Sequence, residues 1–235
     1  LMSGFHGMFS VGGFAGGGGM TLALSSGLSP VASALGGSAL TLAALLPAWP
    51  RLLRAPGGEP VPFVAPRGIV LLLSLLAGIT FLIEGAILDW SALLVVGKDM
   101  VEPAQGGIAY MLFAIAMTVG RLTGDRIVAA AGNRKVLLLG GLLAMAGLVL
   151  LLTSPWTAAG LAGFVLVGLG ASNIVPVLFS LAGRQTVMPP ALAVAAVTTI
   201  GYAGILLGPA AIGFASHLTN LPTAFWLLAA LIALV

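Results

Sequence analysis

Positive charge lies on one side of a row of hydrophobic runs in this sequence. If the side on which residue 1 lies is taken as the inside, eight of the nine Lys and Arg residues fall in inside loops, and Lys98 falls in an outside loop. Lys and Arg are retained on the cytoplasmic side of a membrane during insertion. The pattern therefore predicts a protein integral to the cytoplasmic (inner) membrane, with both ends of this chain in the cytoplasm. The inside residues are Arg51, Arg54, Arg67, Arg121, Arg126, Arg134, Lys135 and Arg184.

The hydrophobic runs have the length that a bilayer requires, about 20 residues for each helix. Only 6% of the residues are charged and 60% are hydrophobic, whereas an average soluble domain has roughly 25% charged residues. Such a chain cannot cover a surface that faces water. We predict an all-α, polytopic membrane bundle with eight transmembrane helices, at about 5–25, 31–49, 68–96, 104–120, 135–153, 156–181, 191–215 and 221–235.

One connection between the predicted spans is rich in breakers. Residues 50–67 contain five of the fourteen prolines and little helical pattern, which is typical of a linker. It separates two spans in residues 1–49 from six spans in residues 68–235. Because the chain starts at Leu1 and enters a span almost at once, we expect it to be part of a longer protein.

Several classes of function are disfavoured by what the sequence lacks. It has no cysteine, so thiolate metal sites and Cys nucleophiles are absent. His6 and His217 are predicted on opposite sides of the membrane and cannot share a metal ion. The glycine runs are not followed by the Lys-Ser/Thr of a phosphate loop. No basic cluster is interleaved with aromatic residues as nucleic-acid binding requires. We therefore expect no cofactor, no metal, no nucleic-acid partner and no enzymatic activity.

A signature of glycines and charged residues follows the fourth predicted span, and it consists of Gly120, Arg121, Gly124, Asp125, Arg126, Gly132, Arg134 and Lys135. It resembles the cytoplasmic signature of the major facilitator superfamily, a Gly-x-x-x-Asp-Arg run closed by Gly-x-Arg-Arg/Lys, in the copy between helices 8 and 9. The resemblance implies that Asp125 pairs with Arg121 and Arg126 and latches the cytoplasmic side. A solvated charge cluster that anchors two helix ends is the alternative.

Two further segments support the same resemblance. Gly201-Tyr202-Ala203-Gly204 with Gly208-Pro209 is similar to helix 11 of the superfamily. Residues 5–13, 84–86 and 89–91 are similar to bacterial members near the fucose-permease-like branch. The resemblance implies helices 5–12 of a 12-helix secondary transporter, which moves a small solute by alternating access, driven by a gradient such as that of protons. The alternative is a non-transporting membrane scaffold or sensor, or an inactive truncated remnant.

Glu84 is the polar residue that the lipid should tolerate least. It lies near the middle of the predicted span 68–96, where a charge costs at least about 2.5–3.5 kcal/mol. With Thr80 and Ser91 it falls on one stripe of the helix, which predicts a polar path. Two interpretations remain open for Glu84. It is either a substrate or proton site, or a hydrogen-bonded residue that ties two helices together.

Other polar residues in the spans are weaker candidates for a substrate cavity. Pro176 cannot donate to the carbonyl of Ser172, so the span 156–181 should break near Asn173. We interpret Asn173 as a substrate contact or an interhelical hydrogen bond. Asp89 lies on a face with Gly78 and Gly85 and suits a packing or outer-gate role better than a cavity role. The remaining candidates are Tyr202 and Tyr110 for the cavity, and Trp90 and Trp156 as anchors at the membrane interface.

Overall fold

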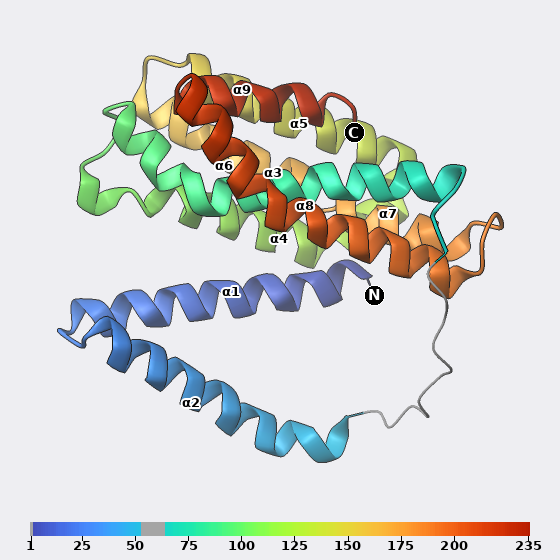
Figure 1. Cartoon of the computed structure of the whole chain (residues 1–235), viewed down its shortest axis with the longest axis horizontal. Helices are drawn as coiled ribbons and strands as arrows, with labels where there is room; N and C mark the ends of the chain where they lie inside the picture. The colour runs from blue at the N-terminus through green and yellow to red at the C-terminus, as the bar shows by residue number, and fades with distance from the viewer. Residues whose placement is uncertain (1, 53–63) are drawn as a thin grey trace. The chain divides into compact units, whose positions relative to one another are not determined.

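The protein is helical throughout the part of the chain that its structure describes. The structure is a computed structural model, and it describes residues 2–52 and 64–235 (Figure 1). Within these ranges the chain forms α-helices, short 3-10 helices, turns and loops. It divides into two compact units, Leu1–Ser10 with Ala65–Val235, and Val11–Val64. Most of the predicted linker, with Arg54, lies outside the described residues.

The smaller unit is a helical hairpin. The last residues of α1 (Met2–Ser25) and all of α2 (Pro30–Ala48) flank a turn in which Gly27 has a φ of 88°. Ser29 caps α2, because its hydroxyl accepts from the backbone N–H of Ala32, and Pro30 occupies the first helical position. A short 3-10 helix, η1 (Trp49–Arg51), follows α2. The leucines of α2 are exposed, and a helix that is apolar all round in this way is suited to a lipid environment.

The larger unit contains the remaining helices, and most of them begin and end close to the predicted spans. The predicted spans 68–96, 135–153, 191–215 and 221–235 correspond to α3, α5, α8 and α9. The helices are α3 (Ile69–Gly97), η2 (Pro103–Gln105), α4 (Ile108–Ala131), α5 (Asn133–Thr153), α6 (Thr157–Ala171), α7 (Ile174–Arg184), α8 (Pro190–Leu218) and α9 (Leu221–Ile232).

Five described helices are long and apolar enough to cross a membrane. The chain is therefore a helical membrane protein. Helix α4 is 24 residues long and carries Arg121, Asp125 and Arg126; it is not among the five. The five membrane-capable segments are Pro30–Arg51 (α2 with η1), Ile69–Gly97 (α3), Asn133–Thr153 (α5), Thr157–Arg184 (α6 with α7) and Pro190–Leu218 (α8).

Helix α4 does not end where the sequence analysis placed its end. The predicted span 104–120 was to be followed by a loop, but the helix runs on to Ala131. No glycine or proline interrupts residues 125–131, so nothing in the chain stops the helix earlier. The reversal takes place at Gly132, whose φ of 80° favours glycine, and α5 begins at the next residue. Most of the predicted signature loop is therefore helical.

The predicted break in the span 156–181 is confirmed. Helix α6 ends at Ala171 and α7 begins at Ile174, with Ser172 and Asn173 between them. Pro176 has no N–H, so the carbonyl of Ser172 loses the donor that a continuous helix would supply. The break thus leaves a free acceptor in the interior of the unit, where both residues are buried.

Helices α3 and α8 make the most extensive contact between helices. A Cβ on Gly204 would clash with the backbone of Gly78, and a Cβ on Gly208 would lie 2.6 Å from the carbonyl oxygen of Leu82. Glycine therefore brings the two backbones into direct contact, as in other membrane helix pairs. The indole N–H of Trp90 donates to the carbonyl of Pro209 at 2.9 Å. Trp90 thus joins α3 to α8, and its predicted role as an anchor at the membrane interface stays a prediction.

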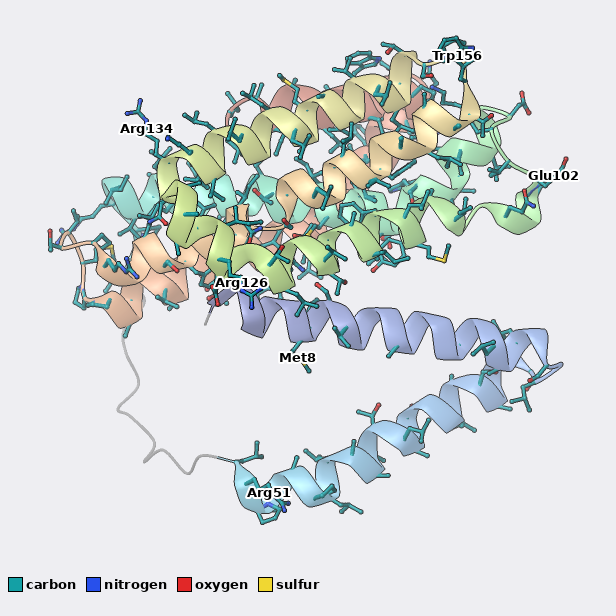
Figure 2. All side chains as sticks on the ribbon, turned by 180° about the vertical axis from the view of Figure 1, so that it is seen from behind. Met8, Arg51, Glu102, Arg126, Arg134 and Trp156 are labelled. Carbon is teal, nitrogen blue, oxygen red and sulfur yellow. The ribbon has the colours of Figure 1, made fainter. Side chains whose placement is uncertain are left out.

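Charged residues and one tryptophan lie toward the two ends of the larger unit. Arg126 and Arg134 lie toward one end, and Glu102 and Trp156 lie at the other (Figure 2). At the end of α3, the ammonium of Lys98 donates to the carbonyls of Leu151 and Leu152, at 2.7 and 3.0 Å. These carbonyls belong to the last turn of α5, where a cation is favourable. Burial lowers the pKa of Lys98 from its ordinary value.

The glycine contact predicts that Gly204→Ala destabilises the protein. The added methyl meets the backbone of Gly78, which cannot move aside as a flexible side chain would, and overpacking of this kind costs about 1–3 kcal/mol. Thermal unfolding in detergent should show a lower Tm. The matched control is Gly183→Ala on α7, because no atom lies within 4 Å of its added Cβ. Equal Tm values for the two variants would contradict the packing described for α3 and α8.

Candidate functional site: a buried arginine at a helix break

Arg121 is a buried residue rather than a loop charge. It lies on α4 and is 3% exposed, which corrects its predicted place in an inside loop. Its Nη2 donates to Oε1 of Glu84 on α3 at 2.6 Å, and the two form an ion pair. The side chain of Glu84 is 11% exposed. The carboxylate that the bilayer should tolerate least thus has its counter-charge on the neighbouring helix.

Two further hydrogen bonds hold the guanidinium of Arg121. Its Nη1 donates to the hydroxyl of Ser10 at 2.8 Å, and its Nε donates to the carbonyl of Ser172 at 3.4 Å. This carbonyl is the acceptor that Pro176 leaves without a helical donor. All three nitrogens of the guanidinium therefore have an acceptor, and Arg121 stabilises the break between α6 and α7.

Asn173 joins the same break to α4. Its Nδ2 donates to the carbonyl of Gly120 at 2.9 Å and to the hydroxyl of Ser172 at 3.0 Å. The residue is 5% exposed, and its Oδ1 is buried without a hydrogen-bond partner. Gly120 permits this contact, since a Cβ there would clash with the side chain of Ser172. We call Ser10, Glu84, Gly120, Arg121, Ser172 and Asn173 the Arg121 cluster.

The other predicted residues of α3 lie outside the Arg121 cluster. Thr80 and Ser91 are fully buried, so they share with Glu84 a side of α3 that is turned toward the protein. The hydroxyl of Thr80 donates to the carbonyl of Leu76 within its own helix, whereas that of Ser91 has no hydrogen bond. Asp89 is exposed.

The two tyrosines have different surroundings. Tyr110 on α4 is half-buried, and both Glu84 and Arg121 act on its phenol electrostatically. Tyr202 on α8 is 54% exposed and stacks on Phe81, with ring centroids 5.8 Å apart. The structure thus places Tyr110 near the Arg121 cluster and turns Tyr202 outward.

The signature residues separate into a buried set and an exposed set. Gly120, Arg121 and Gly124 are buried, and the other members are exposed: Asp125, Arg126, Gly132, Arg134 and Lys135. The signature therefore combines an inner part, which contacts Glu84 and the helix break, with an outer part at the end of α4 and the start of α5.

Sequence reasoning missed Ser10, Ser172 and the inward role of Arg121. One signal was available for Arg121, because a charged Glu84 inside a span requires a partner. For Ser172, the signal was the carbonyl that Pro176 releases. Ser10 carried no signal, because one serine in an apolar helix is ordinary. Among the residues whose placement is described, no group of three His, Cys, Asp or Glu side chains could hold a metal ion.

The chain is similar to three bacterial proteins, two of which are named as transporters. The chain is 50% identical over 235 residues to an uncharacterized MFS-type transporter of Yersinia pestis, with 99% of this chain and 61% of the relative aligned. It is 32% identical over 240 residues to the uncharacterized transporter y4wD of Sinorhizobium fredii, covering 100% of this chain and 63% of the relative. Membrane protein MosC of Rhizobium meliloti is 37% identical over 144 residues, 61% of this chain and 35% of that protein.

The chain spans about three fifths of the length of the two transporters that align with its whole length. No protein-family model matches it. Two of these bacterial relatives are named as transporters and the third as a membrane protein, and the helices described above are apolar. Together these findings support a bacterial helical membrane protein that is similar to proteins named as transporters.

The buried pair predicts a strong coupling between Arg121 and Glu84. Arg121→Met should lower the free energy of unfolding by about 3–5 kcal/mol, because it leaves Glu84 buried without a counter-charge. The double variant Arg121→Met/Glu84→Gln should lose less than the sum of the two single variants, as chemical unfolding in detergent would measure. Arg126→Met, at an exposed position of the same helix, is the control. Additive losses would show that the two side chains do not interact.

Proposed function

We propose that the complete protein is a secondary transporter of the major facilitator superfamily, which moves a small solute across the inner membrane. In this proposal the chain contributes eight membrane helices that correspond to helices 5–12 of a 12-helix fold, with both ends cytoplasmic. The similarity to proteins named as transporters supports the superfamily. The fucose-permease-like branch remains a prediction from residues 5–13 and 84–91.

The Arg121 cluster is the observation that carries the proposal. It combines a buried ion pair with a broken helix, and broken helices line substrate and ion sites in several transporter folds. Lipid disfavours both features, so they are expected where a membrane protein binds or moves something polar. Glu84 would bind the coupled proton, and the solute would bind near Glu84, Asn173 and Tyr110 between two halves of the complete protein.

The non-transporting scaffold or remnant is the competing interpretation. An ion pair at a helix break would then be a structural tie, and the complete protein would bind no solute. The names of the relatives do not favour this interpretation. A transport measurement separates the two, because a scaffold would leave the contents of a vesicle unchanged.

Proteoliposomes of the complete protein should accumulate a solute when a proton gradient is imposed. A defined mixture of small organic metabolites would be offered, and the vesicle contents would be analysed by mass spectrometry. Glu84→Gln should abolish the response to the gradient, because the amide cannot bind the coupled proton. Asp89→Asn, which changes an exposed carboxylate of the same helix, is the control. If the Glu84→Gln variant still accumulated the solute in response to the proton gradient, Glu84 would not be the site of proton coupling.

The outer part of the signature is proposed to latch the cytoplasmic side of the transporter. Asp125→Asn should increase the labelling rate of a cysteine at the exposed position Ala130 by a membrane-impermeant maleimide, because the latch would open more often. The chain has no cysteine of its own, so it adds no background labelling. An unchanged rate would reduce Asp125 to an anchor of the helix end. Labelling from one side of oriented vesicles would also test the proposed topology.

A further inference from the structure

The charge of Arg121 restricts what Glu84 can do. A guanidinium remains protonated in proteins, so Arg121 is a permanent cation at a position that is 3% exposed. The carboxylate of Glu84 is its anionic partner. If Glu84 accepted a proton and nothing else changed, Arg121 would become a buried, unpaired cation, a state that proteins strongly disfavour. Protonation of Glu84 therefore requires another anion beside Arg121.

The net charge of the Arg121 cluster shows which solute fits this requirement. Glu84 and Arg121 sum to zero. The phenol of Tyr110 is neutral at ordinary pH, and Asp125, one turn along α4, is exposed. A monoanion that arrives with one proton on Glu84 keeps the sum at zero. A cation would leave the cluster positive, and a neutral solute would leave protonated Glu84 with no anion to replace it.

The geometry of the Arg121 cluster suits this exchange. Glu84 is the more exposed partner of the pair, with 11% of its side chain accessible against 4% for Arg121, so the carboxylate can leave more easily. The guanidinium is fixed by Ser172 and would remain in place. Its Nη1 donates to a neutral hydroxyl, that of Ser10, which a carboxylate would replace with a stronger, charge-assisted bond.

We propose that Arg121 binds the anionic group of the solute in exchange for Glu84, so that the substrate is a small organic monocarboxylate cotransported with one proton. Glu84 changes from carboxylate to carboxylic acid as the proton binds, and the solute carboxylate takes its place at Nη1 and Nη2. Release on the other side returns the proton and restores the ion pair. One negative and one positive charge move together, so the cycle transfers no net charge. This inference rests on the transport function proposed above.

Acetate is the probe, because it reproduces the carboxylate that Glu84→Ala removes. In the complete protein in detergent at pH 7.5, millimolar acetate should raise the Tm of Glu84→Ala by about 2–4 °C relative to an equal concentration of chloride. Asp89→Ala and the double variant Glu84→Ala/Arg121→Ala should not respond. A response of Glu84→Ala no larger than that of Asp89→Ala would overturn the proposal.

The wild-type protein gives a second test that does not depend on how the variants fold. Its stabilisation by acetate should increase as the pH falls from 8 to 6, because the proposed exchange takes up one proton for each acetate bound, whereas acetate itself stays ionised in this range. A stabilisation that does not change with pH would overturn the exchange. Acetate binding without proton-driven uptake would preserve the anion site and refute the transport proposal. Proton-driven uptake of a neutral or cationic solute would preserve transport and refute this inference.

Discussion

The permanent positive charge of Arg121 is the constraint on which the rest of the interior depends. A guanidinium that is 3% exposed needs acceptors in every direction, and the surrounding elements supply them. Helix α3 contributes Glu84, α1 contributes Ser10, and the break between α6 and α7 contributes the carbonyl of Ser172. A buried cation without these partners would be strongly disfavoured, so this one side chain links the helices that provide them, in addition to their direct packing.

The apolar packing around the Arg121 cluster positions the polar groups that bind the guanidinium. Glycine lets helix backbones touch, as between α3 and α8, and Gly120 lets α4 approach Ser172. Pro176 opens the helix at that contact and releases the carbonyl that Arg121 uses. Small residues and one proline, which would be neutral or unfavourable in an isolated helix, here position polar groups where lipid would otherwise exclude them.

The sequence predicted most of the helices, since long apolar runs and proline-rich interruptions mark them directly. It also predicted the break near Asn173, because the effect of Pro176 is local. It failed where the outcome depends on tertiary contacts. Arg121 was assigned to a loop from its charge, but the helix continued and the side chain turned inward to Glu84 on another helix. Tyr202 is 54% exposed and stacks on Phe81, and its cavity role stays a prediction.

Isotope-edited infrared spectroscopy of Glu84 would test the central claim most directly, because it distinguishes a carboxylate from a carboxylic acid in the intact protein. Glu84→Gln identifies the band of this residue by difference. At pH 7 without added acetate, the account predicts an ionised Glu84 paired with Arg121. At pH 6, acetate should convert it to the carboxylic acid, and Arg121→Met should remove that effect of acetate. A Glu84 band that acetate leaves unchanged would contradict the linkage between anion binding at Arg121 and protonation of Glu84.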